Sequence, residues 1–322
     1  MRTIVKAAFC ALSLSVAVQG ATADEFPSRP IRVIVPYAAG GPSDTGVRLV
    51  QDGLSRELGQ PVVIENRGGG GLNATEAYVK SADRDGYTLL LGGIAPLTVI
   101  PSTKRVSYVA ERDFLPIGIV WRSAQTLVVR PGLGVKTVAE FVKYAKDNPG
   151  KITVGSAGLG TVSHLGGELL KREAGIDLVH LPFRSTSESM PQLLGGQIDA
   201  LFGDASTVAP QVASGKAVAI AVAAPQRSPA LPDTPTFSEA GFPTVQAEGW
   251  HGLVALSDTP ADRVQRLRDA LRKAQSDPAY QARLRQHGAT VGEIGPEAMA
   301  KLIREDTAKW SAIVKAANLK AE

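Results

Sequence analysis

Cysteine and histidine are scarce in this chain, and their scarcity excludes several kinds of site. Cys10 is the only cysteine among 322 residues, so the chain can form neither an internal disulfide nor a cluster of thiolate metal ligands. The four histidines are scattered and none stands in an H-E-x-x-H pattern, so no metal is expected. The sequence also has no lysine-containing phosphate loop, and no cofactor is predicted.

Charge of one sign and long apolar runs are lacking as well. Lysine and arginine number 35 and aspartate and glutamate 31, which leaves a formal net charge of +4. The basic residues are dispersed and are not interleaved with aromatic residues. A nucleic acid or a membrane surface as partner would need a basic patch, so neither is expected. Beyond the N-terminal segment, no apolar run is long enough to span a bilayer.

The first residues, 1–23, have the pattern of an export signal. Arg2 and Lys6 supply positive charge, residues 4–18 are mostly apolar, and residues 21–23 read Ala-Thr-Ala, a typical cleavage site. We therefore expect this signal peptide to be removed, together with the single cysteine, as the protein is exported to the periplasm.

Two glycine-rich turns stand out because each joins an apolar strand to an amphipathic helix. Residues 36–44 read Pro-Tyr-Ala-Ala-Gly-Gly-Pro-Ser-Asp, and residues 155–161 read Gly-Ser-Ala-Gly-Leu-Gly-Thr. Such a turn lets the backbone approach a ligand closely, and the helix that follows offers unpaired N–H groups and the positive end of its dipole. Two turns of this kind, half a chain apart, predict two lobes that close on one small anion.

Strand, turn and helix alternate along the chain, which predicts parallel βαβ units with helices on both faces of a sheet. Residues 31–35 form a β-branched run, and residues 88–91 form a buried run that ends at the glycine pair 92–93. In such sheets ligands bind beyond the carboxyl ends of strands. Residues 73–76 and 137–140 resemble capping boxes and predict two helix starts.

The chain crosses twice between two regions of alternating strands and helices, which predicts a two-lobed α/β protein. The crossings lie near Trp121 and Gly249, and two crossover strands would join the lobes there. Each lobe would be a mostly parallel sheet flanked by helices. We expect residues 24–122 and 250–322 to form the first lobe and residues 123–249 to form the second.

Four sequence blocks resemble one family over essentially the whole exported chain. Residues 27–41 read PSRPIRVIVPYAAGG, residues 59–67 read GQPVVIENR, residues 85–90 read DGYTLL, and residues 227–236 read RSPALPDTPT. In this order the blocks resemble the extracytoplasmic solute receptors of tripartite tricarboxylate transporters, the Bug or TctC family.

The resemblance implies a periplasmic-binding-protein fold, no enzymatic activity, and a small carboxylate held in the cleft between the lobes. It also implies membrane transporter subunits as partners, and we expect a monomer. In this family, backbone groups and bridging water of the two glycine-rich turns grip one ligand carboxylate. Transferred to this sequence, the resemblance implies ligand binding by Tyr37, Gly40, Gly41, Ser43, Asp44, Ser156, Gly158, Gly160, Thr161 and His164. We also predict ligand binding by Ala38 and Ala157 in the same turns, by the strand-end pair Gly92 and Gly93, and by Arg184 and Asp204, where the chain departs from the family pattern.

Some of these residues have an alternative interpretation. Tyr37 can be an ordinary packed aromatic, Asp44 can be a helix-end acid that holds its loop, and His164 can brace the second turn without ionising. Arg184 replaces the usual family lysine. Its guanidinium could take a distal carboxylate with two hydrogen bonds, or it could pair with Glu188 on the surface.

Two other functions stay open at this point. A receptor that informs a membrane sensor kinase would need the same ligand-driven closure, and only adjacent genes would separate the two roles. Ser156, Asp204 and His251 follow the chain order of an α/β-hydrolase triad. However, Val154 occupies the first glycine position of the required G-x-S-x-G turn.

Overall fold

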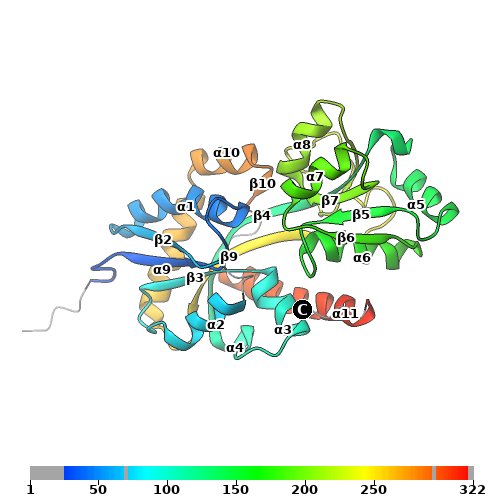
Figure 1. Ribbon diagram of the computed structural model, residues 1–322. Helices are drawn as coiled ribbons and strands as arrows, with labels where there is room; N and C mark the ends of the chain where they lie inside the picture. The colour runs from blue at the N-terminus through cyan, green and yellow to red at the C-terminus, as the bar shows by residue number, and fades with distance from the viewer. Residues whose placement is uncertain (1–24, 69–71, 292–294, 318–322) are drawn as a thin grey trace, which may run out of the picture.

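The computed structural model describes residues 25–68, 72–291 and 295–317. The predicted signal peptide, residues 1–23, lies outside the described residues. The chain forms two α/β halves that lie side by side and share one mixed sheet (Figure 1). Among the described residues, no helix is both long enough and apolar enough to cross a membrane.

The first half of the sheet is parallel, as the alternation of strands and helices predicts. Strand β1 (Ile31–Val35) lies between β2 (Val62–Asn66) and β3 (Thr88–Gly93) and is parallel to both. Helix α1 (Pro42–Leu58) joins β1 to β2, and α2 (Leu72–Ser81) joins β2 to β3. The first glycine-rich turn therefore lies at the carboxyl end of β1.

Helix α1 begins within the first glycine-rich turn, as the sequence predicts, whereas α2 does not begin at its predicted capping box. Gly41 is the N-cap residue of α1, and Pro42 takes the first helical position, where its missing N–H costs nothing. Helix α2 already includes Asn73, so the capping box predicted there is wrong. The Glu76 carboxylate instead accepts a hydrogen bond from the backbone N–H of Ser107 (2.8 Å), a partner that the local pattern could not reveal.

The second half repeats the arrangement of the first. Strand β5 (Thr153–Ser156) is parallel to β6 (Val179–Pro182) and to β7 (Ala200–Asp204). Helix α6 (Val162–Ala174) joins β5 to β6, and α7 (Thr186–Leu194) joins β6 to β7. The second glycine-rich turn thus follows β5 as the first turn follows β1.

Two crossover strands join the halves, as the sequence predicts. Strand β4 (Phe114–Val129) is antiparallel to β9 (Glu248–Leu256). It then continues into the second half, where it pairs with β7 and with β8 (Val218–Val222). The sequence contains two apolar runs here, residues 117–121 and 126–129, which by themselves predict two separate strands. They form one strand because residues 122–124 contain neither glycine nor proline and remain in the ladder with β9, and Gln125 already pairs with β7.

The remaining elements are mostly helices that cover the sheet or connect its strands. They are η1 (Ala95–Val99), α3 (Ile100–Thr103), α4 (Ala110–Asp113), η2 (Pro131–Leu133), α5 (Val138–Asp147), α8 (Ala205–Ala213), α9 (Ala261–Gln275), α10 (Pro278–Gln286), β10 (Ala289–Thr290) and α11 (Pro296–Ala316). The capping box predicted at the start of α5 is confirmed: Thr137 and Glu140 cap each other's backbone N–H groups.

One large apolar core extends across both halves. It includes Phe114 on β4 in the first half, Phe202 on β7 in the second, and Trp250 on β9 between them. Helix α11 runs below the junction in Figure 1 and packs against η1, β4 and α6. The Trp250 indole N–H donates to Asp306 Oδ2 (2.7 Å), so a buried hydrogen bond fastens α11 to the crossover strand β9.

Candidate functional site

The first glycine-rich turn leaves helix α1 without a side-chain cap. The N-cap residue Gly41 has an extended backbone (φ −79°, ψ 172°) and no side chain that could accept from the amides of Ser43 or Asp44. These amides therefore keep donor capacity at the positive end of the helix dipole. Ala38 and Gly40 are exposed, so solvent reaches the turn. An anion placed here would meet backbone donors.

Asp44 holds the first turn from the inside. Its Oδ2 accepts from the N–H of Gly40 (2.8 Å), and its Oδ1 accepts from Nε of Arg48 (2.9 Å). Burial opposes ionisation of this carboxyl. The hydrogen bonds from Arg48, Gly40 and Asn66 together outweigh that effect and hold the pKa of Asp44 below its ordinary value. The carboxylate is thus engaged within the loop itself.

Ser43 and Tyr37 meet a histidine whose place the sequence could not reveal. His251 lies on β9, and a hydrogen bond joins its Nε2 to Oγ of Ser43 (2.9 Å). Its ring stacks on Trp121 of β4 (4.4 Å between centroids, 14°), and the Tyr37 ring meets it edge-on (6.0 Å). Burial lowers the pKa of His251 to about 4. The first turn therefore rests on the two crossover strands.

Gly92 and Gly93 allow β3 to pack closely against its neighbours. A Cβ on Gly92 would lie 2.6 Å from Cδ1 of Leu97. A Cβ on Gly93 would lie 3.0 Å from the carbonyl oxygen of Trp250 and 3.2 Å from Cδ2 of His251. Both glycines are buried, so the structure gives this pair a packing role beside His251.

The second glycine-rich turn is held in shape by its own hydrogen bonds. Thr161 is the N-cap residue of α6, and its Oγ1 also donates to the carbonyl oxygen of Gly158 (2.7 Å). The N–H of Ala157 donates to Oγ of Ser163 (2.9 Å). Gly158 (φ 125°) and Gly160 (φ 71°) adopt backbone conformations that other residues avoid. Most polar groups of this turn are therefore already engaged within it.

Two stacked histidines support the second turn. His164 Nδ1 accepts from the N–H of Gly160 (3.1 Å), and a hydrogen bond joins His180 Nε2 to Oγ of Ser156 (2.7 Å). The two rings lie 3.9 Å apart and nearly parallel (18°). Burial lowers the pKa of each ring to about 4, so both are neutral at neutral pH. His164 thus braces the turn, the second of its two sequence interpretations.

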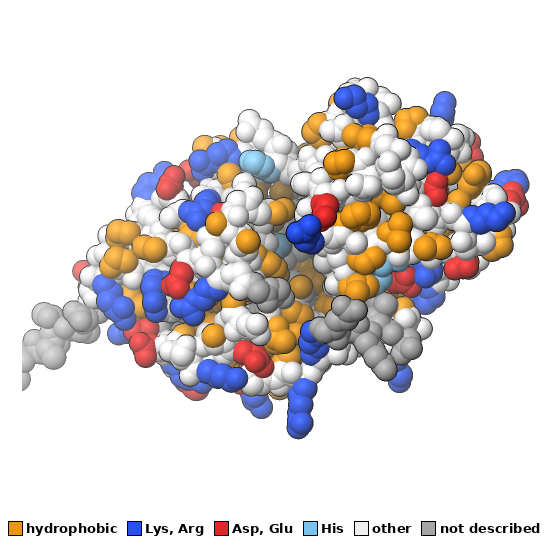
Figure 2. Space-filling model, in the orientation of Figure 1, with side chains coloured by type: hydrophobic (Ala, Val, Ile, Leu, Met, Phe, Trp, Pro, Cys, Tyr) orange, Lys and Arg blue, Asp and Glu red, His pale blue; other side chains and the backbone are white. Residues whose placement is uncertain are grey.

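The glycine turns of both halves border the same junction. A Cβ on Gly160 would lie 3.7 Å from Cγ1 of Val99, in the η1 segment that follows β3. His251 in turn contacts Ser43 of the first turn and lies beside Gly93. Figure 2 shows that the surface is hollowed where the two halves meet.

Arg184 directs its side chain into solvent beside the second turn. The residue before it, Phe183, places its carbonyl oxygen 3.1 Å from where a Cβ on Gly158 would lie. The Arg184 side chain itself is 93% exposed, and its Nε lies 3.4 Å from Oε2 of Glu188. The structure thus shows the surface pairing that the sequence left open beside ligand contact.

Asp204 lies at the crossover strands, and no hydrolase triad is assembled around it. Its Oδ1 accepts from Nε2 of Gln125 (2.9 Å) and from Oγ of Ser123 (3.3 Å), and burial raises the pKa of the carboxyl. Ser156 and His251, the other members of the hydrolase order, each form a hydrogen bond with a different residue. The catalytic alternative therefore lacks its geometry.

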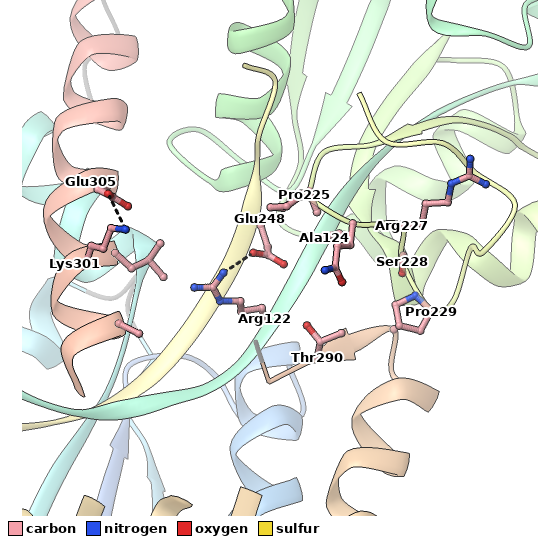
Figure 3. A pocket seen from close by; sticks show the side chains of 15 residues that line it. Arg122, Ala124, Pro225, Arg227, Ser228, Pro229, Glu248, Thr290, Lys301 and Glu305 are labelled. Atoms are coloured by element: carbon pink, nitrogen blue, oxygen red, sulfur yellow. Dashed lines mark hydrogen bonds and ion pairs between the residues drawn. The ribbon is translucent and has the colours of Figure 1, made fainter. Parts of the chain in front are cut away.

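A separate cavity of about 560 Å³ lies where the crossover strands, α11 and the segment after β8 meet, and none of the predicted binding residues lines it. In Figure 3, Arg122 and Glu248 point toward each other (3.0 Å), Lys301 lies 3.8 Å from Glu305, and Arg227 points away from the ion pair. Arg122 and Lys301 already face carboxylates, and Arg227 pairs with Glu239 (3.0 Å), so the cavity is a poor match for an anion.

Comparisons with known proteins agree with the sequence blocks. The family model for the tripartite tricarboxylate transporter family receptor matches residues 47–319. An Agrobacterium vitis protein, described as the UPF0065 protein in the TAR-I ttuE-ttuC' intergenic region, is 38% identical over 255 residues, 79% of this chain and 74% of its own. Protein BugT of Bordetella pertussis is 31% identical over 297 residues, 91% of each chain.

Solved structures show the same fold. MatC from Rhodopseudomonas palustris with bound malate is 33% identical, with a TM-score of 0.77 over 90% of this chain and all of MatC, 100%. Another R. palustris protein, solved with adipate, is 28% identical, with a TM-score of 0.79 over 92% of this chain and 99% of that protein. Family and fold are those of solute-binding proteins and not of enzymes. The chain belongs to the tripartite tricarboxylate transporter receptor family, as its sequence blocks indicated.

Proposed function

We propose that this chain is a periplasmic receptor that captures a small organic carboxylate between its two lobes for uptake by a tripartite tricarboxylate transporter. The observation that carries the proposal is the uncapped first turn of α1, which leaves backbone donors at an exposed glycine loop. Two structural relatives, one with malate and one with adipate, support a carboxylate as the ligand class.

The proposed lobes are residues 24–122 with 250–322, and residues 123–249. The ligand would lie between them, against the two turns and near Asp204, with Gly92 and Gly93 behind the first turn. Backbone N–H groups at the start of α1 would bind the carboxylate, and the second turn would close against the ligand as a surface of fixed shape, while Asp44 and His164 hold the turns. The turn residues of the site are Tyr37, Ala38, Gly40, Gly41, Ser43, Asp44, Ser156, Ala157, Gly158, Gly160, Thr161 and His164.

The proposed mechanism is closure of the lobes about β4 and β9. Only a closed form lets one carboxylate-bearing ligand meet both turns, and a ligand shifts the equilibrium by its difference in affinity for the two forms. The membrane subunits of the transporter would then recognise the closed receptor, which acts as a monomer. Small-angle scattering should show a smaller radius of gyration with ligand, and an unchanged radius with a tight ligand contradicts closure.

A thermal-shift assay tests the ligand class. Malate and adipate should raise the melting temperature, because a ligand at 100 times its dissociation constant adds about 2.7 kcal/mol to the free energy of unfolding. The uncharged diamide of each acid is the matched control and should give no shift. Equal shifts from acid and diamide would show that the site does not select an anion.

A substitution at Gly41 tests the place of binding. The backbone of Gly41 suits a serine N-cap, and an added Cβ meets only the Ala38 carbonyl oxygen at 3.5 Å. In Gly41→Ser the new hydroxyl caps the amides that the ligand would use, so the ligand-free protein should be as stable as before but respond weakly to malate. The control is Gly167→Ala, whose Cβ would lie 3.8 Å from Phe202. An unchanged response in Gly41→Ser refutes the assigned site.

A further inference from the structure

The second turn depends on an imidazole that carries no proton at one nitrogen. His164 Nδ1 accepts the hydrogen bond from the N–H of Gly160 (3.1 Å), so in this arrangement Nδ1 is unprotonated. A protonated ring would place an N–H against the Gly160 N–H, and that bond would be lost. The neutral ring is therefore the only form that fits the observed geometry.

The surroundings of His164 do not favour a second positive charge. His180 stacks on it at 3.9 Å, so two protonated rings would repel each other. Glu168 Oε1 lies 3.9 Å from His164 Nε2, but it is already paired with Nζ of Lys171 (3.0 Å). Burial first, and the Lys171 charge as a smaller cause, lower the pKa of both histidines to about 4.

The first turn depends on a neutral imidazole as well. His251 Nε2 shares a hydrogen bond with Oγ of Ser43, and within the described part of the chain its Nδ1 is buried without a hydrogen-bond partner. A protonated ring could still donate from Nε2 to Ser43, but its positive charge and an Nδ1–H without an acceptor would be buried beside the Trp121 face and the Tyr37 ring. The charged ring is therefore expected to leave this place and to release Ser43. The Tyr37 phenol offers no counter-charge, because burial raises its pKa. The nearby Asp44 carboxylate is already engaged by its own loop.

We propose that His164 and His251 are positioning residues that hold the two glycine-rich turns in their binding shape only as neutral rings, so that acid loosens both turns and releases the ligand. This inference takes its ligand from the proposed function. The coupling between each ring and its turn does not depend on that function. The two clusters lie in different halves and share no residue. Acid therefore loosens both glycine-rich turns that contact the ligand.

The expected loss of affinity follows from the fraction of molecules in which both clusters are neutral. With each cluster about half protonated near pH 4, about one molecule in four keeps both turns held, and the apparent affinity falls about fourfold. One pH unit lower, about one molecule in a hundred does so, and the loss is about a hundredfold. Protonation of the ligand also lowers the affinity. A variant without the titrating histidines is therefore needed to separate the two effects.

The coupling can be tested without any ligand. NMR of the imidazole nitrogens should show His164 and His251 neutral at pH 6 and titrating near pH 4. The backbone amide signals of Gly160 and Ser43 should move with the same midpoints. A ring that titrates near the ordinary value of about 6.5 overturns the proposal. So does a Gly160 amide that stays fixed while His164 titrates.

Binding of malate, measured by calorimetry between pH 7 and pH 4, is the second test. The variant combines His164→Asn, His180→Gln and His251→Gln, whose amides place polar atoms near the ring nitrogens and do not titrate. The affinity at pH 7 divided by the affinity at pH 4 should be about fourfold smaller for this variant than for the wild type. The control His287→Gln changes an exposed histidine and should keep the wild-type ratio.

Equal ratios in the wild type and the triple variant overturn the proposal. Circular dichroism at each pH establishes that the proteins are folded, and the NMR titration of the wild type decides the matter where the triple variant does not fold. If malate and adipate fail to bind at pH 7, the proposed function is contradicted. The NMR titration still decides whether the rings control the turns.

Discussion

The two glycine-rich turns have similar compositions, but the protein stabilises them in different ways. In the first, one buried carboxylate, Asp44, holds Gly40, and helix α1 starts without a cap. In the second, Thr161 caps α6, and its hydroxyl also fixes Gly158. The first turn thus keeps unpaired donors, whereas the second uses its polar groups to set its own shape. Similar turns can therefore contribute free donors in one lobe and a rigid surface in the other.

The largest expected effect tests what the two turns share, their neutral histidines. His164, His180 and His251 have pKa values of about 4 in the folded protein, against about 6.5 in an unfolded chain. Between these values the unfolded state binds more protons than the folded state. The stabilisation that depends on the neutral rings is therefore fully present above pH 6.5 and is lost as the pH falls toward 4. Each ring contributes about 1.4 kcal/mol per pH unit in this range, so the three together should lower the free energy of unfolding by roughly 4 kcal/mol per pH unit. Urea unfolding at several pH values measures it, and a flat profile contradicts the buried neutral rings.

A second prediction separates the turns by their backbone. Gly158→Val should lower the free energy of unfolding by about 2–3 kcal/mol, because φ is 125° and the Cβ would lie 3.1 Å from the carbonyl oxygen of Phe183. Gly41→Val should cost less than about 1 kcal/mol, because its φ is −79°. Urea unfolding of both variants gives the two values. Equal losses would mean that the first turn is as constrained as the second.

A third prediction concerns the cap that only the second turn has. Thr161→Ala removes the hydroxyl that accepts from the His164 amide and donates to Gly158, so the free energy of unfolding should fall by about 1–2 kcal/mol. Thr161→Ser keeps the hydroxyl and should recover most of the loss. Chemical denaturation of the three proteins provides the comparison. If serine fails to restore stability, the methyl group matters more than the cap.

The smallest effect is expected at the edge of the second turn. Arg184→Ala should change the free energy of unfolding by less than about 0.5 kcal/mol, because the exposed pair with Glu188 contributes little. Its affinity for malate should stay within about twofold of the wild type. A tenfold loss in calorimetry would show that the guanidinium turns inward to the ligand.

Features set by neighbours in the sequence were predictable. The β-branched run located β1, and the glycine-rich turn at residues 36–44 located the start of α1. The prediction failed at Asn73, where a capping pattern is present but Glu76 bonds to Ser107 instead. Local patterns state what a segment can do alone, and a distant partner can change the outcome.

The site was predictable as two loops but not as one junction. Ser43 and His251 are hydrogen-bonded although 208 positions separate them, and no local pattern links them. The same holds for the stacking of His251 on Trp121, which requires β4 and β9 to be paired. For Arg184 the sequence offered two partners, and only the folded chain shows that Glu188 is within reach. Contacts between elements decide these roles.

The ladder between β4 and β9 has a mechanical consequence. The two halves are joined by paired strands and not by loose loops, so any rotation between them must twist a hydrogen-bonded ribbon. The pairing slips in register between Pro116 and Gly118, and again between Ile119 and Trp121. Such irregularities bend a strand locally and disrupt its ladder. The paired strands should therefore twist most easily at these two irregularities. The two halves could then rotate relative to each other through a limited angle and return.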